Sequence, residues 1–305
     1  MNSSHRGPRA LLIAGPTASG KSALALRFAR EQGATIVNAD SMQVYRDLRL
    51  LTARPPVEEE RLAPHLLFGA IDGAENFSVG RYEARAREIL ARVAGRIVFV
   101  GGTGLYFRAL TQGLSDIPPE PDEVRARIRE NAVGRETHEL HAELGGADPA
   151  SAARLRPSDR QRTLRALEVF AATGRSLTEF QSNKGAPALR AGEWRGLFLA
   201  PDREVLKRRI AERFAAMLAV GALAEVAALA ARGLDPALPI MRAHGAPHLM
   251  AHLRGEMSLD EAAALGIRDT KAYARRQFTW ARHQLPDFAW VTPDEADAAV
   301  ARALG

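Results

Sequence analysis

The chain has 305 residues, of which 46% are hydrophobic and 26% are charged, with a net charge of +6. This composition excludes an intrinsically disordered chain and leaves room for one large domain with an insertion, or for two modest domains. The excess of positive charge suits an acidic partner such as nucleic acid, although many basic proteins have no such role.

The chain contains no cysteine. Disulfides, thiolate nucleophiles and cysteine-ligated zinc are therefore excluded, which fits a reducing compartment. The N-terminal MNSSHRGPR leads directly into an apolar run, with neither a long hydrophobic segment nor a small-residue cleavage site. We therefore expect a cytoplasmic protein without membrane association.

Short apolar runs alternate with helical patterns along the chain. The segment 21–33 and the segment 78–95 have apolar residues on one face at helical spacing, and the first closes on Gly33. Alternation of this kind predicts an open α/β fold, with a mainly parallel sheet flanked by helices. The runs that predict buried strands are residues 10–15, 35–40, 96–102 and 195–201, with a late candidate at 287–293.

A central segment differs in character from the rest. Residues 117–190 begin with prolines and continue with helical patterns rich in Arg, Glu and Ala, without a strong strand signal. We predict an inserted helical domain over 117–190, and an α/β core formed by 1–116 and 191–305. After the fourth strand, residues 202–233 repeat apolar side chains at helical spacing and predict long amphipathic helices.

The first predicted strand runs into GPTASGKS, which fits the phosphate-loop pattern between a strand and a helix. Backbone N–H groups of such a loop face an anion, Lys21 adds a positive charge, and the Ser22 hydroxyl can ligate Mg²⁺ on the phosphates. The motif predicts phosphate binding without identifying the rest of the ligand. Its residues are Gly15, Pro16, Thr17, Ala18, Ser19, Gly20, Lys21 and Ser22.

Residues that follow the other strands are expected to lie near this loop, because ligands of open α/β sheets bind beyond the carboxyl ends of the strands. The second strand delivers Asp40, Ser41 and Gln43, and the third delivers Gly101 to Gly104, including Thr103. A carboxylate there can orient a magnesium shell or accept a proton from a nucleophile. Asp is also a frequent helix N-cap, and the residues alone leave both roles of Asp40 open.

Several motifs together closely resemble the tRNA dimethylallyltransferase (tRNA isopentenyltransferase) family. They are GPTASGKS, ADSMQVY, VGGTGLYF and DRQRTLRALEVFAATGRSL, followed by RIAERFAAMLAVGALAEV, PIMRAHG and TKAYARRQFTW. The order and spacing match over nearly the whole chain. The resemblance implies a P-loop NTPase-like core with an inserted helical domain that contacts tRNA.

The resemblance also implies a reaction. A dimethylallyl group passes from dimethylallyl diphosphate to the N6 amine of adenosine 37, next to the tRNA anticodon, with Mg²⁺ as cofactor and pyrophosphate as product. Asp40 matches the general base, Thr103 a hydrogen-bonding partner near the reacting atoms, and Arg213 an arginine that reaches the diphosphate. An exposed helix face is the alternative for Arg213.

The family's RNA-contact segments also match positions of this chain. The matching residues are Asp40, Ser41, Met42, Gln43, Thr103, Arg125, Gln161, Arg162, Arg165, Arg242, Lys271, Arg275, Arg276 and Gln277. One departure stands out, because Ala246 replaces a tyrosine usual in the family and puts the local RNA contact in doubt.

For other side chains in these segments we expect positions in the core or at the surface rather than a role in binding. Tyr273, Phe278 and Trp280 are expected in the core rather than as base-stacking platforms. His244, His248 and His252 fall four residues apart, but Pro247 interrupts the helix and no acidic ligand follows, so we expect surface histidines.

Two other functions remain open from the motifs. An ATP-dependent kinase of small molecules or nucleosides would use the same loop for a nucleotide, and a non-catalytic RNA-binding protein would use the loop as a switch. By resemblance we expect a monomer whose partners are dimethylallyl diphosphate and the anticodon stem-loop of tRNA.

Overall fold

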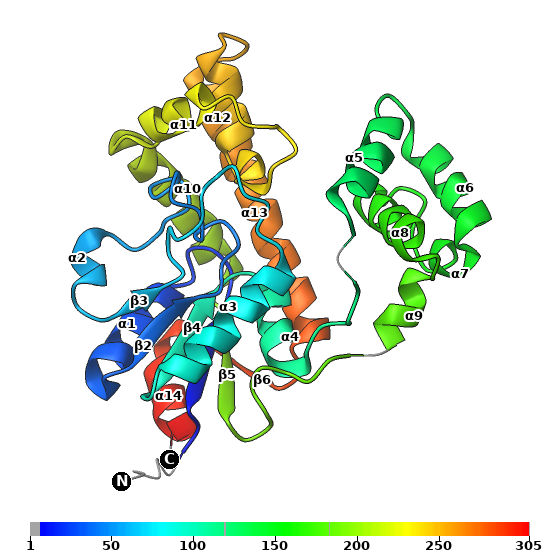
Figure 1. Ribbon diagram of the computed structural model, residues 1–305. Coiled ribbons are helices and arrows are strands. Elements are labelled where there is room, and N and C mark those ends of the chain that lie inside the picture. The colour runs from blue at the N-terminus through cyan, green and yellow to red at the C-terminus, as the bar shows by residue number, and fades with distance from the viewer. Residues whose placement is uncertain (1–6, 119, 183, 305) are drawn as a thin grey trace. The chain divides into compact units, whose positions relative to one another are not determined.

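A six-stranded parallel sheet forms the centre of the fold (Figure 1). The computed structural model describes residues 7–118, 120–182 and 184–304, so residues 1–6 of the N-terminal segment lie outside the described residues. The strand order is β3-β2-β4-β1-β5-β6, and every neighbouring pair is parallel. The strands are β1 (Ala10–Ala14), β2 (Thr35–Asn38), β3 (His65–Leu66), β4 (Ile97–Gly101), β5 (Trp194–Leu199) and β6 (Phe288–Val291).

The predicted α/β class is confirmed, with a strand at each of the five predicted positions. The sixth strand, β3, was not predicted, because a strand of two residues is too short to produce a periodic pattern.

Helices of the α/β core surround the sheet. Each face of the sheet has its own hydrophobic core, because consecutive side chains of a strand point to opposite faces. Ile13 packs with Leu24 and Phe28 of α1, whereas Leu12 packs in the cluster that contains Tyr82 of α3. The helices of this part are α1 (Lys21–Gln32), α2 (Val57–Glu60), α3 (Val79–Arg92), α4 (Gly104–Gln112), α10 (Arg203–Ala219), α11 (Ala222–Ala231), α12 (Ala246–Leu253), α13 (Leu259–Gln284) and α14 (Ala296–Leu304), with short 3-10 helices η1 (Pro239–Arg242) and η2 (Pro293–Glu295).

The predicted helical stretch at 202–233 is divided into α10 and α11. Gly221 adopts a left-handed conformation with φ of 108° at the start of α11, which glycine tolerates and other residues resist. Within the described part of the chain, no single helix is long and apolar enough to cross a membrane. Among the described helices, only the pair α10 and α11, bent by 68°, reaches that length and composition.

The chain divides into two compact units, residues 1–111 with 188–305, and residues 112–187. The limits expected from sequence were 117 and 190. The smaller unit consists of helices with a separate apolar cluster that includes Leu144, Leu167 and Phe180. Its helices are α5 (Asp122–Asn131), α6 (Thr137–Ala147), α7 (Pro149–Ala152), α8 (Arg160–Thr173) and α9 (Leu177–Ser182).

The last residue of β4 allows an unusually close approach between strands. A Cβ atom added to Gly101 would lie 2.0 Å from the carbonyl oxygen of Ala39 and 2.6 Å from the backbone nitrogen of Asp40. Because these are backbone atoms, they cannot move aside as a flexible side chain can. Gly101 therefore fixes how closely the ends of β2 and β4 pack.

Substitution of Gly101 by alanine is expected to destabilise the protein. The added methyl group has no space, and overpacking of this kind costs about 3 kcal/mol of unfolding free energy. Gly80→Ala is the matched control, because the nearest heavy atom to its added Cβ is 3.9 Å away, and alanine in a helix should be neutral or slightly stabilising. Urea unfolding of both variants measures the difference, and equal stabilities would contradict the close approach.

Candidate active site

The phosphate-loop motif occupies the turn between β1 and α1. Gly20 precedes α1 with φ of 93°, and Ala18 also has a positive φ, 63°. A side chain at Gly15 would crowd the loop, since a Cβ there would lie 2.9 Å from Ser19 Oγ and 3.1 Å from the carbonyl oxygen of Leu199. Because α1 begins at Lys21, its first N–H groups and the positive end of its dipole belong to this turn. This geometry suits an anion.

Lys21 supplies a buried positive charge beneath the loop. Its Nζ donates a hydrogen bond to the carbonyl oxygen of Pro16 at 3.1 Å. Burial lowers the pKa of the Lys21 amine from 10.5 to about 8, while the Asp40 carboxylate opposes this shift and Arg213 adds to it. Lys21 is therefore mostly protonated at pH 7.

Asp40 follows β2, and a buried asparagine holds its backbone. The Asp40 N–H donates to Asn38 Oδ1 at 2.9 Å, and Asn38 Nδ2 donates to the Asp40 carbonyl oxygen at 2.9 Å. Asp40 Oδ1 accepts a hydrogen bond from the Met42 N–H at 3.0 Å. This is an Asx turn, and residues 41–44 form turns rather than a helix, so the alternative of a helix N-cap was wrong.

Thr103 connects the end of β4 to the same turn. Its N–H donates to the carbonyl oxygen of Ala39 at 3.2 Å. Its Oγ1 accepts from the Ser41 N–H at 2.9 Å and donates to Ser41 Oγ at 3.2 Å. The segments that follow β2 and β4 are therefore joined by hydrogen bonds around Asp40.

Gln277 of α13 joins this unit to the phosphate loop. Its Nε2 donates to the carbonyl oxygen of Gly102 at 2.8 Å, and its Oε1 accepts from the Thr17 N–H at 3.2 Å. The side chain is buried. One amide group thus satisfies a donor of the loop and an acceptor after β4, which fixes the distance between them.

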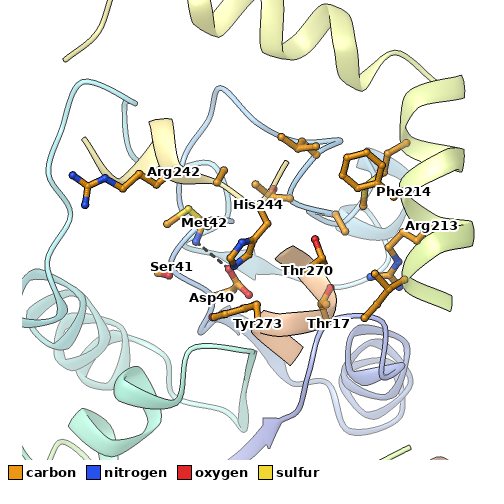
Figure 2. Close-up of a pocket in the computed structure, with 16 residues that line it drawn as sticks. Thr17, Asp40, Ser41, Met42, Arg213, Phe214, Arg242, His244, Thr270 and Tyr273 are labelled. Carbon is orange, nitrogen blue, oxygen red and sulfur yellow. Dashed lines mark hydrogen bonds between the residues drawn. The ribbon is translucent and has the colours of Figure 1, made fainter. Parts of the chain in front are cut away.

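A pocket of about 240 Å³ opens beside these residues, and we call it the Asp40 pocket (Figure 2). In the view of Figure 2, Thr17 and Arg213 lie on one side, Ser41, Met42 and Arg242 on the other, and Asp40 lies between them below His244. The pocket is lined by Thr17, Asp40, Ser41, Met42, Leu51, Thr52, Ala53, Ile210, Arg213, Phe214, Met217, Arg242, Ala243, His244, Thr270 and Tyr273.

A second cavity of about 160 Å³ lies next to the phosphate loop and the turn after β4. It is lined by Gly15, Thr103 and Gln277 and by the aromatic residues Phe107, Phe198 and Trp280. Tyr273 lines both this cavity and the Asp40 pocket. Burial and the nearby Asp40 raise the pKa of Tyr273, so its phenol stays protonated.

The structure brings many of the predicted site residues to these two cavities. The residues at the Asp40 pocket are Thr17, Asp40, Ser41, Met42, Arg213 and Arg242, and those at the second cavity are Gly15, Thr103, Arg276 and Gln277. Ser22 lies half-buried in the first turn of α1.

Other predicted residues lie elsewhere. The Gln43 amide donates to the carbonyl oxygens of Thr52 and Ala53, so it braces the pocket wall. Lys271 and Arg275 lie on α13, where Arg275 is exposed. The predicted residues of the smaller unit are Arg125, Gln161, Arg162 and Arg165.

The aromatic and histidine predictions need correction in part. Phe278 and Trp280 pack against the core as expected. Tyr273 is instead a pocket wall, and His244 packs against it with ring centroids 4.4 Å apart. His244 was expected at the surface, and that was wrong, because the loop before α12 turns it into the Asp40 pocket. Burial, with Arg276 nearby, lowers the pKa of His244, so the ring is neutral at pH 7.

Two family models match the sequence. The model described as IPP transferase matches residues 43–284, and the model described as isopentenyl transferase matches residues 8–63. The chain belongs to the IPP transferase family. Together the two models include the phosphate loop, the Asp40 turn and all of α13, which are the segments that form the site.

Curated relatives and solved structures agree with this assignment. A tRNA dimethylallyltransferase of Methylocella silvestris is 66% identical over 292 residues, covering 95% of this chain and 96% of the relative. One of Rhodopseudomonas palustris is 59% identical and covers 96% and 92%. The structure is similar to that of the tRNA isopentenylpyrophosphate transferase of Bacillus halodurans, with a TM-score of 0.68, 28% identity and coverage of 97% and 96%.

A crystal structure of a eukaryotic dimethylallyltransferase acting on tRNA has the same fold, with a TM-score of 0.80 at 24% identity. The match covers 97% of this chain and 78% of that one. These family members have a P-loop NTPase-like fold, as the sequence predicted.

Replacement of Gln277 by alanine is expected to destabilise the fold, because it removes the partner of the part-buried Thr17 N–H and of the buried Gly102 carbonyl. Each unsatisfied group costs about 1–3 kcal/mol, so we expect a loss of about 3 kcal/mol in unfolding free energy. Thr279→Ala is the control, because Thr279 is an exposed residue of the same helix and should change stability by no more than about 0.5 kcal/mol. Similar losses in both variants, measured by denaturant unfolding, would argue against the bridging role.

Proposed function

We propose that this protein transfers a dimethylallyl group from dimethylallyl diphosphate to the N6 amine of adenosine 37 of tRNA, beside the anticodon, and releases pyrophosphate. The relatives named tRNA dimethylallyltransferase support this proposal. The observation that carries it is the Asp40 pocket, where a carboxylate shares one cavity with Thr17 of the phosphate loop and with Arg213.

The phosphate loop and two cations would hold the diphosphate. Residues 15–22 offer backbone N–H groups at the start of α1, and Lys21 and Arg213 supply positive charge from two directions. As the bond between the prenyl C1 and the bridging oxygen breaks, negative charge grows on pyrophosphate. Preset donors and cations stabilise this charge without reorganising, which is the largest contribution such a site makes.

Asp40 would act as the general base. The lone pair of an adenine N6 amine is delocalised into the ring, so the amine is a weak nucleophile. As the new N6–C1 bond forms, the nitrogen loses a proton, and the Asp40 carboxylate accepts it, an effect of about 10² to 10⁴-fold. Thr103, already bonded to Ser41, would hydrogen-bond near the reacting atoms.

The adenine would reach Asp40 from the side of the pocket that carries Ser41, Met42 and Arg242. A stacked base in an RNA loop must be extruded to enter such a pocket. Phosphate contacts would come from exposed basic residues of α13 and from the smaller unit. These proposed RNA contacts are Lys271, Arg275, Arg276, Arg125, Gln161, Arg162 and Arg165. Gln277, which the sequence also suggested, is buried and its amide is bonded to Thr17 and Gly102, so it is not proposed as an RNA contact.

A divalent metal fits the donors that the loop offers. Among the residues the structure describes, no three or more His, Cys, Asp or Glu side chains gather around one point. Mg²⁺ commonly binds through substrate phosphates, waters and one or two protein oxygens, and the Ser22 hydroxyl would provide such an oxygen. When bound, the ion would add positive charge next to the leaving pyrophosphate.

The two alternatives lack comparable support, since the named relatives are neither kinases nor non-catalytic RNA-binding proteins. We propose that the protein acts as a monomer in the cytoplasm, where its tRNA substrate is found.

The Asp40→Asn variant tests the proposed base. Asparagine keeps the oxygen that accepts from the Met42 N–H, so the turn should survive while the charge is lost. We expect transfer of a labelled dimethylallyl group to an anticodon stem-loop to fall about 10² to 10⁴-fold with RNA affinity little changed. The exposed Asp294→Asn variant should keep wild-type activity. Near-normal turnover of the Asp40→Asn protein would remove Asp40 from this role.

Lys21 predicts a pH dependence of diphosphate binding. Its pKa of about 8 means that the free protein loses this charge as pH rises through 8, so binding then requires uptake of a proton and weakens, by up to tenfold per pH unit. Arginine stays protonated, so affinity of Lys21→Arg for inorganic pyrophosphate should lack this loss. Calorimetry from pH 7 to 9.5 gives the affinities of wild type and Lys21→Arg for pyrophosphate. Their ratio is independent of the titration of pyrophosphate itself, because that titration affects both proteins equally. A ratio that stays constant over this pH range would contradict the proposal that the Lys21 charge holds the diphosphate.

A further inference from the structure

A buried carboxylate in the smaller unit holds two arginines together. Glu120 precedes α5, and its side chain is only 5% exposed. One carboxylate oxygen accepts from Arg125 at 3.1 Å (Nε) and 2.5 Å (Nη2), and the other lies 2.5 Å from Arg165 Nη1. Arg125 belongs to α5 and Arg165 to α8, so Glu120 bridges two helices with one oxygen for each arginine.

The charge of Glu120 is secure at neutral pH. Burial raises the pKa of this carboxyl group, but hydrogen bonds from Arg165 and Arg125 outweigh burial and bring the pKa down to about 2. Two guanidinium groups so close to each other would otherwise repel. The carboxylate between them offsets that repulsion.

The two arginines are not enclosed by these contacts. Their side chains are 29% and 39% exposed, whereas the Glu120 side chain is buried. A second buried carboxylate, Glu168 of α8, lies 3.9 Å from Arg165 Nη1 and accepts from Arg129 Nε at 2.9 Å. Each arginine is therefore fixed on its inner side while part of it stays accessible from solvent.

We propose that Glu120 is a positioning residue that presents Arg125 and Arg165 as one preset pair to a phosphate group of the RNA. This inference rests on the proposed function, in which both arginines contact tRNA. A flexible arginine loses conformational freedom when it binds a phosphate, and an arginine already fixed by a buried carboxylate has lost that freedom on folding. Planar guanidinium groups also suit phosphate oxygens when their orientation is fixed.

A purely structural role for Glu120 predicts something different. In that case the carboxylate would only join α5 to α8, and its loss would lower stability but leave the affinity of the folded protein unchanged or higher. Removal of a negative charge near a phosphate site strengthens RNA binding when electrostatics alone acts. The sign of the change in affinity therefore separates the two roles.

Glu120→Gln and Asp122→Asn form a matched pair for this test. Each removes one negative charge from a partner of Arg125, but Asp122 is 96% exposed and lies 3.1 Å from a single nitrogen, Arg125 Nη1. Dissociation constants for an anticodon stem-loop are measured by filter binding over a range of salt, at a temperature where thermal melting shows both variants folded. We expect Glu120→Gln to bind about three- to tenfold more weakly than wild type, and Asp122→Asn to bind equally or more tightly.

Two further variants complete the test. In an Arg125→Gln, Arg165→Gln background, Glu120→Gln should cause no additional weakening, because the side chains it positions are gone. Should Glu120→Gln fail to fold, Glu120→Asp replaces it. The shorter acid keeps the charge but cannot reach both arginines, and it should also bind the RNA more weakly.

The inference would be overturned if Glu120→Gln, or Glu120→Asp in its place, bound the RNA as tightly as wild type. It would also be overturned if Asp122→Asn weakened binding equally. The proposed function is judged separately by prenyl transfer of the wild-type protein. If the wild type binds the stem-loop without transfer, the proposed function fails while the affinities still decide the role of Glu120. If the wild type does not bind the RNA, both proposals fail.

Discussion

The side-chain amide of Gln277 is the link on which the arrangement of the site depends. It ties the Thr17 N–H of the phosphate loop to the carbonyl oxygen of Gly102 after β4. Gly101 and Thr103 continue this link to β2, the glycine by allowing close approach to Ala39 and the threonine by bonding to Ser41. Three strand ends and the long helix α13 thus hold Asp40 at a fixed place beside the loop.

This rigidity has an electrostatic consequence. The buried Lys21 amine would lose more of its proton without Asp40, because the carboxylate raises its pKa while burial and Arg213 lower it. The Asp40 carboxylate therefore helps the buried Lys21 amine to keep its positive charge. Burial of the Lys21 amine is tolerated because the oppositely charged Asp40 carboxylate lies nearby, on a turn held by hydrogen bonds.

Local signals in the sequence predicted the parts of the site with strong backbone requirements. The sequence predicted the phosphate loop of residues 15–22 from its glycine pattern. It also predicted the polar residues that follow the apolar strands, because both features have characteristic local spacings. Asn38 and Gln277 act as braces through contacts between segments distant in the chain, and no local pattern reports such contacts. His244 was misjudged for the same reason, since the direction of a loop side chain depends on what packs against it.

The neutral state of His244 and the charged state of Lys21 define a pH range for the site. His244 gains a proton only below its usual pKa of 6.5, because burial and Arg276 oppose the charge. Lys21 loses its proton only near pH 8. Between these limits the imidazole beside Asp40 carries no charge that would compete for the carboxylate, and the amine under the loop keeps the charge that suits a diphosphate. Over the same range of pH the pocket therefore has a neutral imidazole beside Asp40 and a cationic amine under the phosphate loop.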